Sequence, residues 1–167
     1  MAVILITGGA RSGKSRRAEL RARSFPGQLV YIATAEALDA EMDERIARHR
    51  ARRGNDWIER EVPLDLAEAL VATDGGGARL VDCLTLWLSN LMHAERGWQR
   101  EVSELAAALP RLKSPVVFVT NEVGLGIVPD NALARSFRDA AGIMNQIIAG
   151  VADEVEFVVA GLPMKLK

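Results

Sequence analysis

The chain has 167 residues, of which 49% are apolar, with one cysteine and a formal net charge of −1. This length and apolar content suit one domain, residues 1–167, with a sizeable core. The near-neutral charge argues against a general nucleic-acid-binding protein, a lone cysteine excludes an internal disulfide, and no apolar run approaches the roughly 20 residues of a membrane span.

The first element along the chain is an apolar run at 2–7, followed by Gly8–Ser15, which reads GGARSGKS. The segment matches G-x-x-x-x-G-K-[ST], the phosphate-binding P-loop, although an ordinary glycine-rich turn is the alternative. The run before it predicts a buried strand, and good helix formers follow Lys14. This order directs backbone N–H groups and a helix N-terminus at an anion, with Lys14 at the β- and γ-phosphates and the Ser15 hydroxyl at Mg²⁺. The chain starts directly with this strand, without a basic segment and a cleavable apolar one, so we expect no signal peptide and a cytoplasmic protein.

Strands and helices alternate along the rest of the chain. We expect strands at 28–34, 57–62, 78–83, 115–120 and 154–161, with a short edge strand at 162–167. Helices are predicted at 39–53, 64–73, 84–95 and 98–109, and a long one follows a loop at 121–131. That last helix carries an apolar stripe with spacings of three and four: Leu133, Phe137, Ala141, Met144, Ile148 and Val151. The alternation predicts an α/β fold, a mostly parallel sheet with helices on both faces.

Ligands of parallel α/β sheets bind outside the carboxyl ends of the strands. The P-loop, residues 33–36, Asp82 with Thr85, and residues 121–126 each follow a predicted strand. We therefore expect these four groups to line one rim of the sheet.

Two acidic residues on this rim are candidate Mg²⁺ ligands. Asp82 closes one apolar strand and Glu122 follows another, and one carboxylate, acting directly or through water, is the usual protein partner of a nucleotide-bound Mg²⁺. Either residue could instead be a helix N-cap or a loop acid.

The predicted helix at 39–53 is rich in arginine around His49. On a helix, Arg45 and Arg53 lie one turn either side of His49, and this density of arginines suits triphosphate binding. Nearby positive charge disfavours the imidazolium, and a neutral imidazole can act as a nucleophile. The alternatives are a solvated basic helix with an incidental histidine, or a helix that binds RNA phosphates, which the overall charge and the lack of interleaved aromatics disfavour. The other histidine, His93, is predicted to be structural, and two histidines with one cysteine make a zinc site improbable.

Six stretches in this order resemble one family, the bifunctional adenosylcobinamide kinase / adenosylcobinamide-phosphate guanylyltransferases of cobalamin biosynthesis. They are GGARSGKS, YIATA, RIARHRARRGNDW, VDCLTLWLSNLM, VTNEVGLGIVPDNALARSFRDAAGIMNQ and AGLPMKLK. The resemblance extends from Val3 to Lys167. A P-loop is shared by many families, whereas TNEVGLGIVP and the arginine-rich histidine helix are far more specific.

The resemblance implies a RecA-like P-loop NTPase fold and two reactions. In the first, the aminopropanol hydroxyl of adenosylcobinamide takes the γ-phosphate of ATP or GTP. In the second, GTP transfers GMP to adenosylcobinamide phosphate through a guanylylated histidine, giving adenosyl-GDP-cobinamide and pyrophosphate. The partners it implies are these corrinoids and nucleotides, without nucleic acid or membrane, in a homo-oligomer similar to trimeric proteins with sites at subunit contacts.

The resemblance also assigns residues. The catalytic ones are His49, as the carrier of GMP, and Lys14. The P-loop motif and the acids at the strand ends, rather than the resemblance, place Mg²⁺ on Ser15 and Asp82, with Glu122 as the alternative. The nucleotide-binding positions are Gly8, Gly9, Ala10, Arg11, Ser12, Gly13, Lys14, Ser15, Ile32, Ala33, Thr34, Arg50, Ala51, Arg52, Arg53, Glu61 and Asp82. Two departures concern Asp82, where relatives have glutamate with a longer reach, and the segment 92–113, which is shorter than in some relatives.

Two other functions remain open. A plain P-loop kinase for a small molecule would use the basic helix only to bind phosphate. A nucleotide-dependent switch or assembly module would use its triphosphate for regulation.

Overall fold

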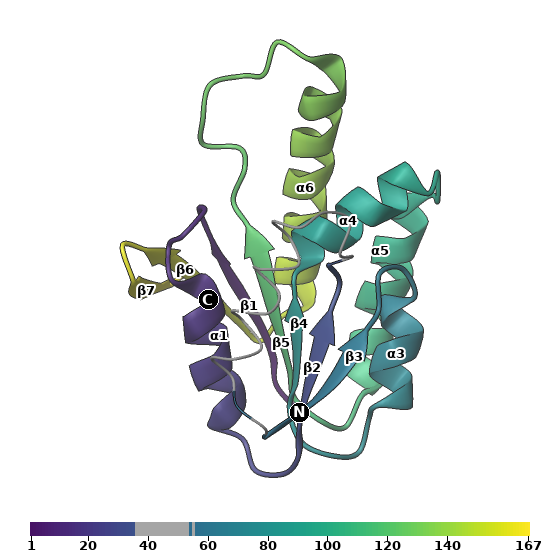
Figure 1. The fold of residues 1–167 in the computed structure, drawn as a ribbon, viewed down its shortest axis with the longest axis vertical. Helices are drawn as coiled ribbons and strands as arrows, with labels where there is room; N and C mark the ends of the chain where they lie inside the picture. The colour runs from purple at the N-terminus through teal and green to yellow at the C-terminus, as the bar shows by residue number, and fades with distance from the viewer. Residues whose placement is uncertain (36–53, 55) are drawn as a thin grey trace.

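A computed structural model describes residues 1–35, 54 and 56–167. Within this part of the chain, the strands form one seven-stranded sheet in the order β3-β2-β4-β5-β1-β6-β7 (Figure 1). The strands are β1 (Val3–Gly8), β2 (Leu29–Ala33), β3 (Trp57–Glu61), β4 (Arg79–Asp82), β5 (Val116–Asn121), β6 (Glu154–Val159) and β7 (Leu162–Lys165). Neighbouring strands pair in parallel, except that β7 runs antiparallel to β6. The carboxyl ends of β1 to β6 therefore share one edge.

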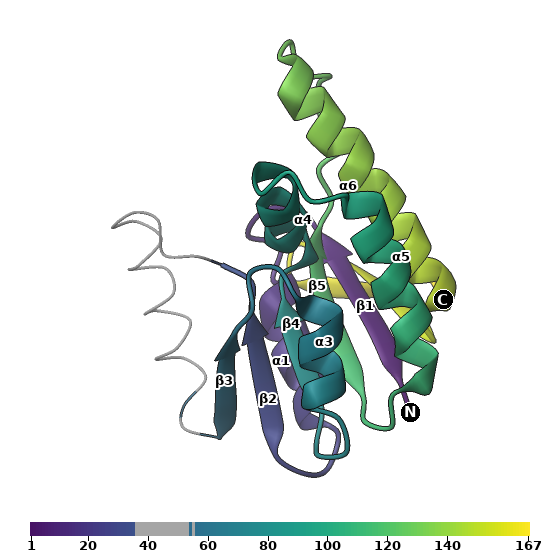
Figure 2. The ribbon, with the colours of Figure 1, turned by 90° about the vertical axis from the view of Figure 1, so that its right-hand side faces the viewer.

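Helices cover both faces of the sheet. They are α1 (Lys14–Arg23), α3 (Leu66–Ala72), α4 (Leu84–His93), α5 (Trp98–Ala108) and α6 (Ala132–Val151), with a 3₁₀ turn at Leu109–Arg111. Figure 2 shows α1 behind the sheet and α3, α5 and α6 in front of it. The predicted α/β fold with a mostly parallel, doubly covered sheet is confirmed.

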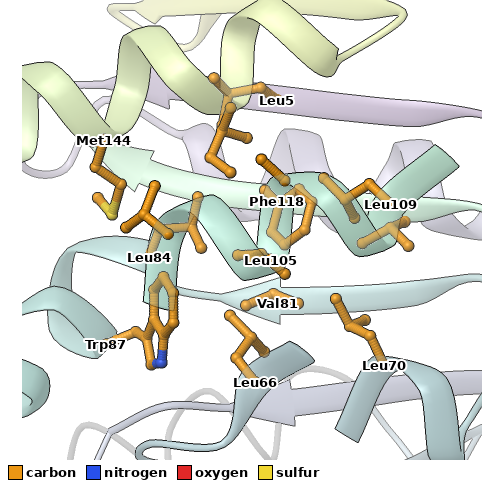
Figure 3. Close-up of a cluster of buried hydrophobic side chains, with 14 of the residues drawn as sticks. Leu5, Leu66, Leu70, Val81, Leu84, Trp87, Leu105, Leu109, Phe118 and Met144 are labelled. Atoms are coloured by element: carbon orange, nitrogen blue, oxygen red, sulfur yellow. The ribbon is translucent and has the colours of Figure 1, made fainter. Parts of the chain in front are cut away.

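Two apolar clusters hold these layers together. The larger one joins alternate strand residues to α3, α4, α5 and α6, and Figure 3 shows Phe118 of β5 at its centre, near Leu105 and Leu109. The smaller cluster lies under α1, where Ala18 and Ala22 contact the other face. Alanine at both positions keeps the axis of α1 close to the sheet, and this brings the start of the helix next to the end of β1.

The predicted apolar stripe of α6 is only partly right. Ala141, Met144 and Ile148 are buried and Phe137 is half-buried, but Leu133 is 66% exposed and Val151 37% exposed. Figures 1 and 2 show the reason for Leu133, because the first turns of α6 extend beyond the sheet. Periodicity marks which face of a helix can be buried, but not how far its packing partner extends.

The other predicted elements within the described residues are confirmed, with their ends moved by at most two residues. The last long strand ends early, at Val159, because Ala160 and Gly161 take positive φ angles of 51° and 80° and turn the chain into β7. The helix predicted at 39–53 lies outside the described residues. Among the described helices, none has the length and apolarity that a membrane crossing requires.

Candidate nucleotide-binding site

The loop between β1 and α1 has the backbone geometry of a phosphate cradle. Gly13 directly precedes α1 with a φ of 96°, a left-handed conformation that favours glycine. A Cβ atom on Gly8 would lie 2.5 Å from the carbonyl oxygen of Val158, so β6 leaves no room for a side chain there. The glycines of the motif are therefore required by the fold itself. With α1 starting at Lys14, the first amides of the helix face the loop.

The Lys14 ammonium lies against the backbone of the loop, beside two buried hydroxyls. The Lys14 Nζ donates a hydrogen bond to the Gly9 carbonyl, 3.1 Å away, and the lysine is 9% exposed. Two hydroxyls, Ser12 Oγ and Thr7 Oγ1, are buried without a hydrogen-bond partner among the described residues. Ser15 lies in the first turn of α1 and is half-buried. A buried ammonium beside a backbone turn of glycines is suited to bind an anion.

The expected rim is confirmed by the strand pairing. β5 lies directly beside β1, and the Glu122 backbone N–H donates to the Gly8 carbonyl at 3.0 Å. Asp82 ends β4, one strand further out, and its Oδ2 accepts a hydrogen bond of 3.2 Å from the Tyr31 hydroxyl. Glu122 instead accepts the Gly124 backbone N–H through Oε1, 2.5 Å away. Both carboxylates are on the edge that carries the P-loop.

The residues at the end of β2 serve mainly to hold the strands together. Ile32 and Thr34 are fully buried, and Ala33 between them is half-buried. The Thr34 hydroxyl donates to the Cys83 carbonyl at 2.7 Å and accepts the Cys83 N–H at 2.8 Å. The Thr34 hydroxyl is therefore already bonded to the chain that follows β4. The nucleotide contacts assigned to Ile32, Ala33 and Thr34 stay predictions. Glu61 ends β3, the outermost strand, and its contact stays a prediction.

The arginine-rich segment is not part of the described structure, so the assignments to His49, Arg50, Ala51, Arg52 and Arg53 stay predictions. His93 lies at the exposed end of α4, where its Nδ1 is 2.8 Å from the Ser89 carbonyl oxygen.

Sequence reasoning missed two residues that support the site. Tyr31 contacts Asp82 from the neighbouring strand, and Gly161, in the turn after β6, donates its backbone N–H to the Ser12 carbonyl at 2.8 Å. Alternation along β2 places Tyr31 on the same face as Ala33, but only the pairing of β2 with β4 shows that this face meets Asp82.

A family model described as cobinamide kinase / cobinamide phosphate guanyltransferase matches residues 4–166. The chain belongs to this family. Similar members are the bifunctional adenosylcobalamin biosynthesis protein CobP of Pseudomonas aeruginosa, 48% identical over 98% of this chain and 96% of that protein, and CobU of Salmonella typhimurium, 44% identical over 99% of both. CobU of Escherichia coli is 42% identical over the same shares. The resemblance to this family that the sequence motifs indicated is therefore confirmed over nearly the whole chain.

Solved structures share the fold of this cobinamide kinase family member at low sequence identity. The flagellar accessory protein FlaH of Methanocaldococcus jannaschii has a TM-score of 0.56 and 13% identity, over 99% of this chain and 78% of FlaH. A type III secretion ATPase has a TM-score of 0.58 and 12% identity, over 98% of this chain and 56% of that one. The P4 protein of bacteriophage phi6, in complex with ADP, has a TM-score of 0.53 and 14% identity, over 97% and 52%. These likenesses show the P-loop NTPase fold.

Proposed function

We propose that this protein phosphorylates adenosylcobinamide with ATP or GTP and then transfers GMP from GTP to the new phosphate. The products of the second reaction are adenosyl-GDP-cobinamide and pyrophosphate. The observation that carries the proposal is a P-loop preformed at the carboxyl edge of the sheet, in a chain that matches bifunctional relatives along almost its full length.

In the kinase step, the corrinoid hydroxyl oxygen attacks the γ-phosphorus, its proton passes to water, and the bond to the β–γ bridging oxygen breaks. Lys14 and the amides of the loop hold the β- and γ-phosphates in line with the hydroxyl and offset the charge that moves to the leaving nucleotide. Positioning of this kind supplies most of the catalysis in phosphoryl transfer.

The residues on the rim fit a Mg²⁺ ion carried in by the nucleotide. Ser15 offers a hydroxyl and Asp82 a carboxylate whose Oδ1 accepts no hydrogen bond from the described residues, and such oxygen donors are the ones that Mg²⁺ prefers. No group of three or more His, Cys, Asp or Glu side chains within 1–35 and 56–167 is placed to hold a metal. The other ligands would be phosphate oxygens and water, as is usual for nucleotide-bound Mg²⁺. When bound, the ion would neutralise charge on the phosphates. We assign Ser15 and Asp82 to this task, with Glu122 as the alternative.

In the guanylyl step, a ring nitrogen of His49 attacks the α-phosphorus of GTP and pyrophosphate leaves. An oxygen of adenosylcobinamide phosphate then attacks the same phosphorus and the P–N bond breaks. We propose that the P-loop holds the departing β- and γ-phosphates while Arg50, Arg52 and Arg53 bind the α-phosphate. A covalent intermediate divides one difficult displacement into two easier ones.

Labelled GTP tests the guanylyl step. We expect α-labelled GTP to leave acid-labile, alkali-stable label on the protein, since a phosphoramidate has this stability, and γ-labelled GTP to leave none. His49→Ala should abolish the label. The matched control is His93→Ala, which removes the exposed imidazole at the end of α4 and should keep the label. Label that persists in His49→Ala would move the nucleophile to another residue.

Incubation of the protein with adenosylcobinamide, GTP and Mg²⁺, followed by separation of the corrinoids, tests the complete reaction. A plain kinase would make adenosylcobinamide phosphate without any GMP adduct. A regulatory switch would transfer no phosphate to the corrinoid at all.

The family resemblance also leads us to propose a homo-oligomer, with a trimer as the specific expectation. Exposed apolar side chains that a subunit contact could cover include Leu125 and Ile127 of the loop after β5, 81% and 96% exposed. Light scattering of the purified protein measures the subunit number directly. Because its nucleotide substrates are cytoplasmic, we propose the cytoplasm as its location.

A further inference from the structure

The two ends of the P-loop are both attached to the same distant element, the hairpin of β6 and β7. At the strand end, Gly8 pairs with Val158 of β6. At the helix end, a Cβ atom on Gly13 would lie 3.2 Å from the Cα of Gly161, so the turn of the hairpin packs directly on the glycine before Lys14. The hydrogen bond from the Gly161 N–H to the Ser12 carbonyl, 2.8 Å long, adds a third point of attachment.

A buried carboxylate fixes the helix that follows the loop. Glu156 of β6, whose side chain is 4% exposed, accepts two hydrogen bonds from Arg17, at 2.7 Å from Nε and 2.8 Å from Nη2. Arg21, one turn further along α1, donates to the same carboxylate at 2.7 Å. Fork-shaped guanidinium contacts of this kind constrain orientation as well as distance.

Arg17 lies three residues after Lys14, so the first turn of α1 is the part that Glu156 holds in place. A helix that slid or rotated on β6 would move the Lys14 ammonium and the first helix amides together, because both belong to the same rigid turn. A displacement of about 1 Å in groups that position a substrate is enough to cost two orders of magnitude in rate.

We propose that Glu156 is a positioning residue for phosphate binding: acting through Arg17 and Arg21, it holds α1 and the P-loop against the β6–β7 hairpin in the conformation that receives the triphosphate. The proposal rests on the proposed function only for the identity of the nucleotide. It predicts that the loop depends on a carboxylate that touches neither the phosphates nor the metal.

The test is the binding of GTP and of GMP to Glu156→Gln, measured with fluorescent analogues well below the unfolding temperature of the variant. Glutamine keeps the shape of the side chain but removes its charge. We expect the Kd for GTP to rise at least about tenfold, the size of effect seen when a residue that orients a direct ligand is lost. The Kd for GMP should change much less, since GMP lacks the β- and γ-phosphates that the loop holds.

The matched control is Glu154→Gln on the same strand. Glu154 contacts Arg21 at 2.9 Å and 3.1 Å, and its side chain is 30% exposed. Among the described residues, the Arg17 side chain hydrogen-bonds to Glu156 and not to Glu154. We expect the affinity of Glu154→Gln for GTP to stay within about threefold of the wild type, since partly exposed ion pairs contribute little to stability. If Glu156→Gln is too unstable to measure, Arg17→Lys keeps the charge but loses the fork and should give a smaller loss in the same direction.

Wild-type affinity for GTP in folded Glu156→Gln would overturn the proposal, as would equal losses for GTP and GMP, or equal losses in the two glutamate variants. Nucleotide binding needs no corrinoid, so a protein that binds GTP but makes no corrinoid product would refute the proposed function and leave this inference standing.

Discussion

The Arg79 guanidinium lies 3.0 Å from the Asp74 carboxylate, at the edge of the sheet opposite the P-loop. Arg79 is fully buried, and its other side-chain hydrogen bonds go to the backbone carbonyls of Leu70, Ser114 and Pro115. Asp74 in turn accepts the backbone N–H groups of Lys113 and Ser114 at 2.9 to 3.0 Å. One ion pair therefore ties the end of α3, the start of β4 and the chain leading into β5.

Asp74→Ala should destabilise the protein by about 3 kcal/mol, because it leaves a buried guanidinium without its countercharge. Urea unfolding at pH 7 measures the change. The matched control is Asp56→Ala, which removes an exposed partner of Arg23 and should cost less than about 1 kcal/mol. Equal effects of the two substitutions would contradict the role of the buried pair.

Stability should fall as the pH drops below about 5. Hydrogen bonds from Arg17 lower the pKa of Glu156, and those from Arg21 lower the pKa of Glu154. Burial opposes ionisation of Asp74, but the backbone N–H groups of Ser114 and Lys113 and the charge of Arg79 outweigh it, so its pKa is lowered as well.

For these groups the unfolded chain binds more protons, so the free energy of unfolding rises with pH through this range. The contribution of these carboxylates to the free energy of unfolding is complete above their pKa values in the unfolded chain, about 4. It is lost as the pH falls through their lower pKa values in the folded protein. Urea titrations between pH 7 and pH 3 measure the slope. Glu156→Gln should be less stable at pH 7 and show a shallower acid loss, and an unchanged slope would count against the assignment.

Cys83 should resist thiol reagents in the folded protein. Burial raises the pKa of its thiol to about 11, helped by the negative charge of Asp82, so almost no thiolate exists at pH 8. A thiol-specific chromogenic reagent should react slowly with the native protein and with one thiol per chain in urea. Rapid stoichiometric reaction under native conditions would show that Cys83 is accessible.

Gly142→Ala and Gly13→Ala should have opposite effects. Gly142 lies within α6, where an added Cβ meets nothing within 4 Å, so alanine should stabilise the helix by about 0.5–1 kcal/mol. Gly13 has a φ of 96° and packs on Gly161, so alanine there should strain the loop and weaken GTP binding. Thermal unfolding and nucleotide titration distinguish the two, and a Gly13→Ala protein with normal affinity would show that the loop can relax.

Much of the fold could be predicted from local patterns. Apolar runs located β1 and β5, and spacings of three and four located α6. The error on α6 concerned how far its packing extends. Leu133 repeats the period of the stripe but belongs to the first turn of α6, which extends beyond the sheet. Periodicity is a property of neighbouring residues, whereas burial depends on what another part of the chain places opposite them.

The candidate site divides in the same way. The loop that carries Gly8, Gly13, Lys14 and Ser15 could be located from spacing alone, because a phosphate cradle is built from consecutive backbone groups. Tyr31 could not be paired with Asp82 before the order of the strands was known.

The sequence by itself determined the chemistry of the loop and the succession of strands and helices, since both depend on residues close together in the chain. Only the tertiary structure decided which element supports that loop: Arg17 and Glu156 are 139 positions apart, and their contact exists because β6 pairs with β1. Non-local strand pairing leaves no local pattern in the sequence, so the hairpin that holds the phosphate cradle becomes visible only in three dimensions.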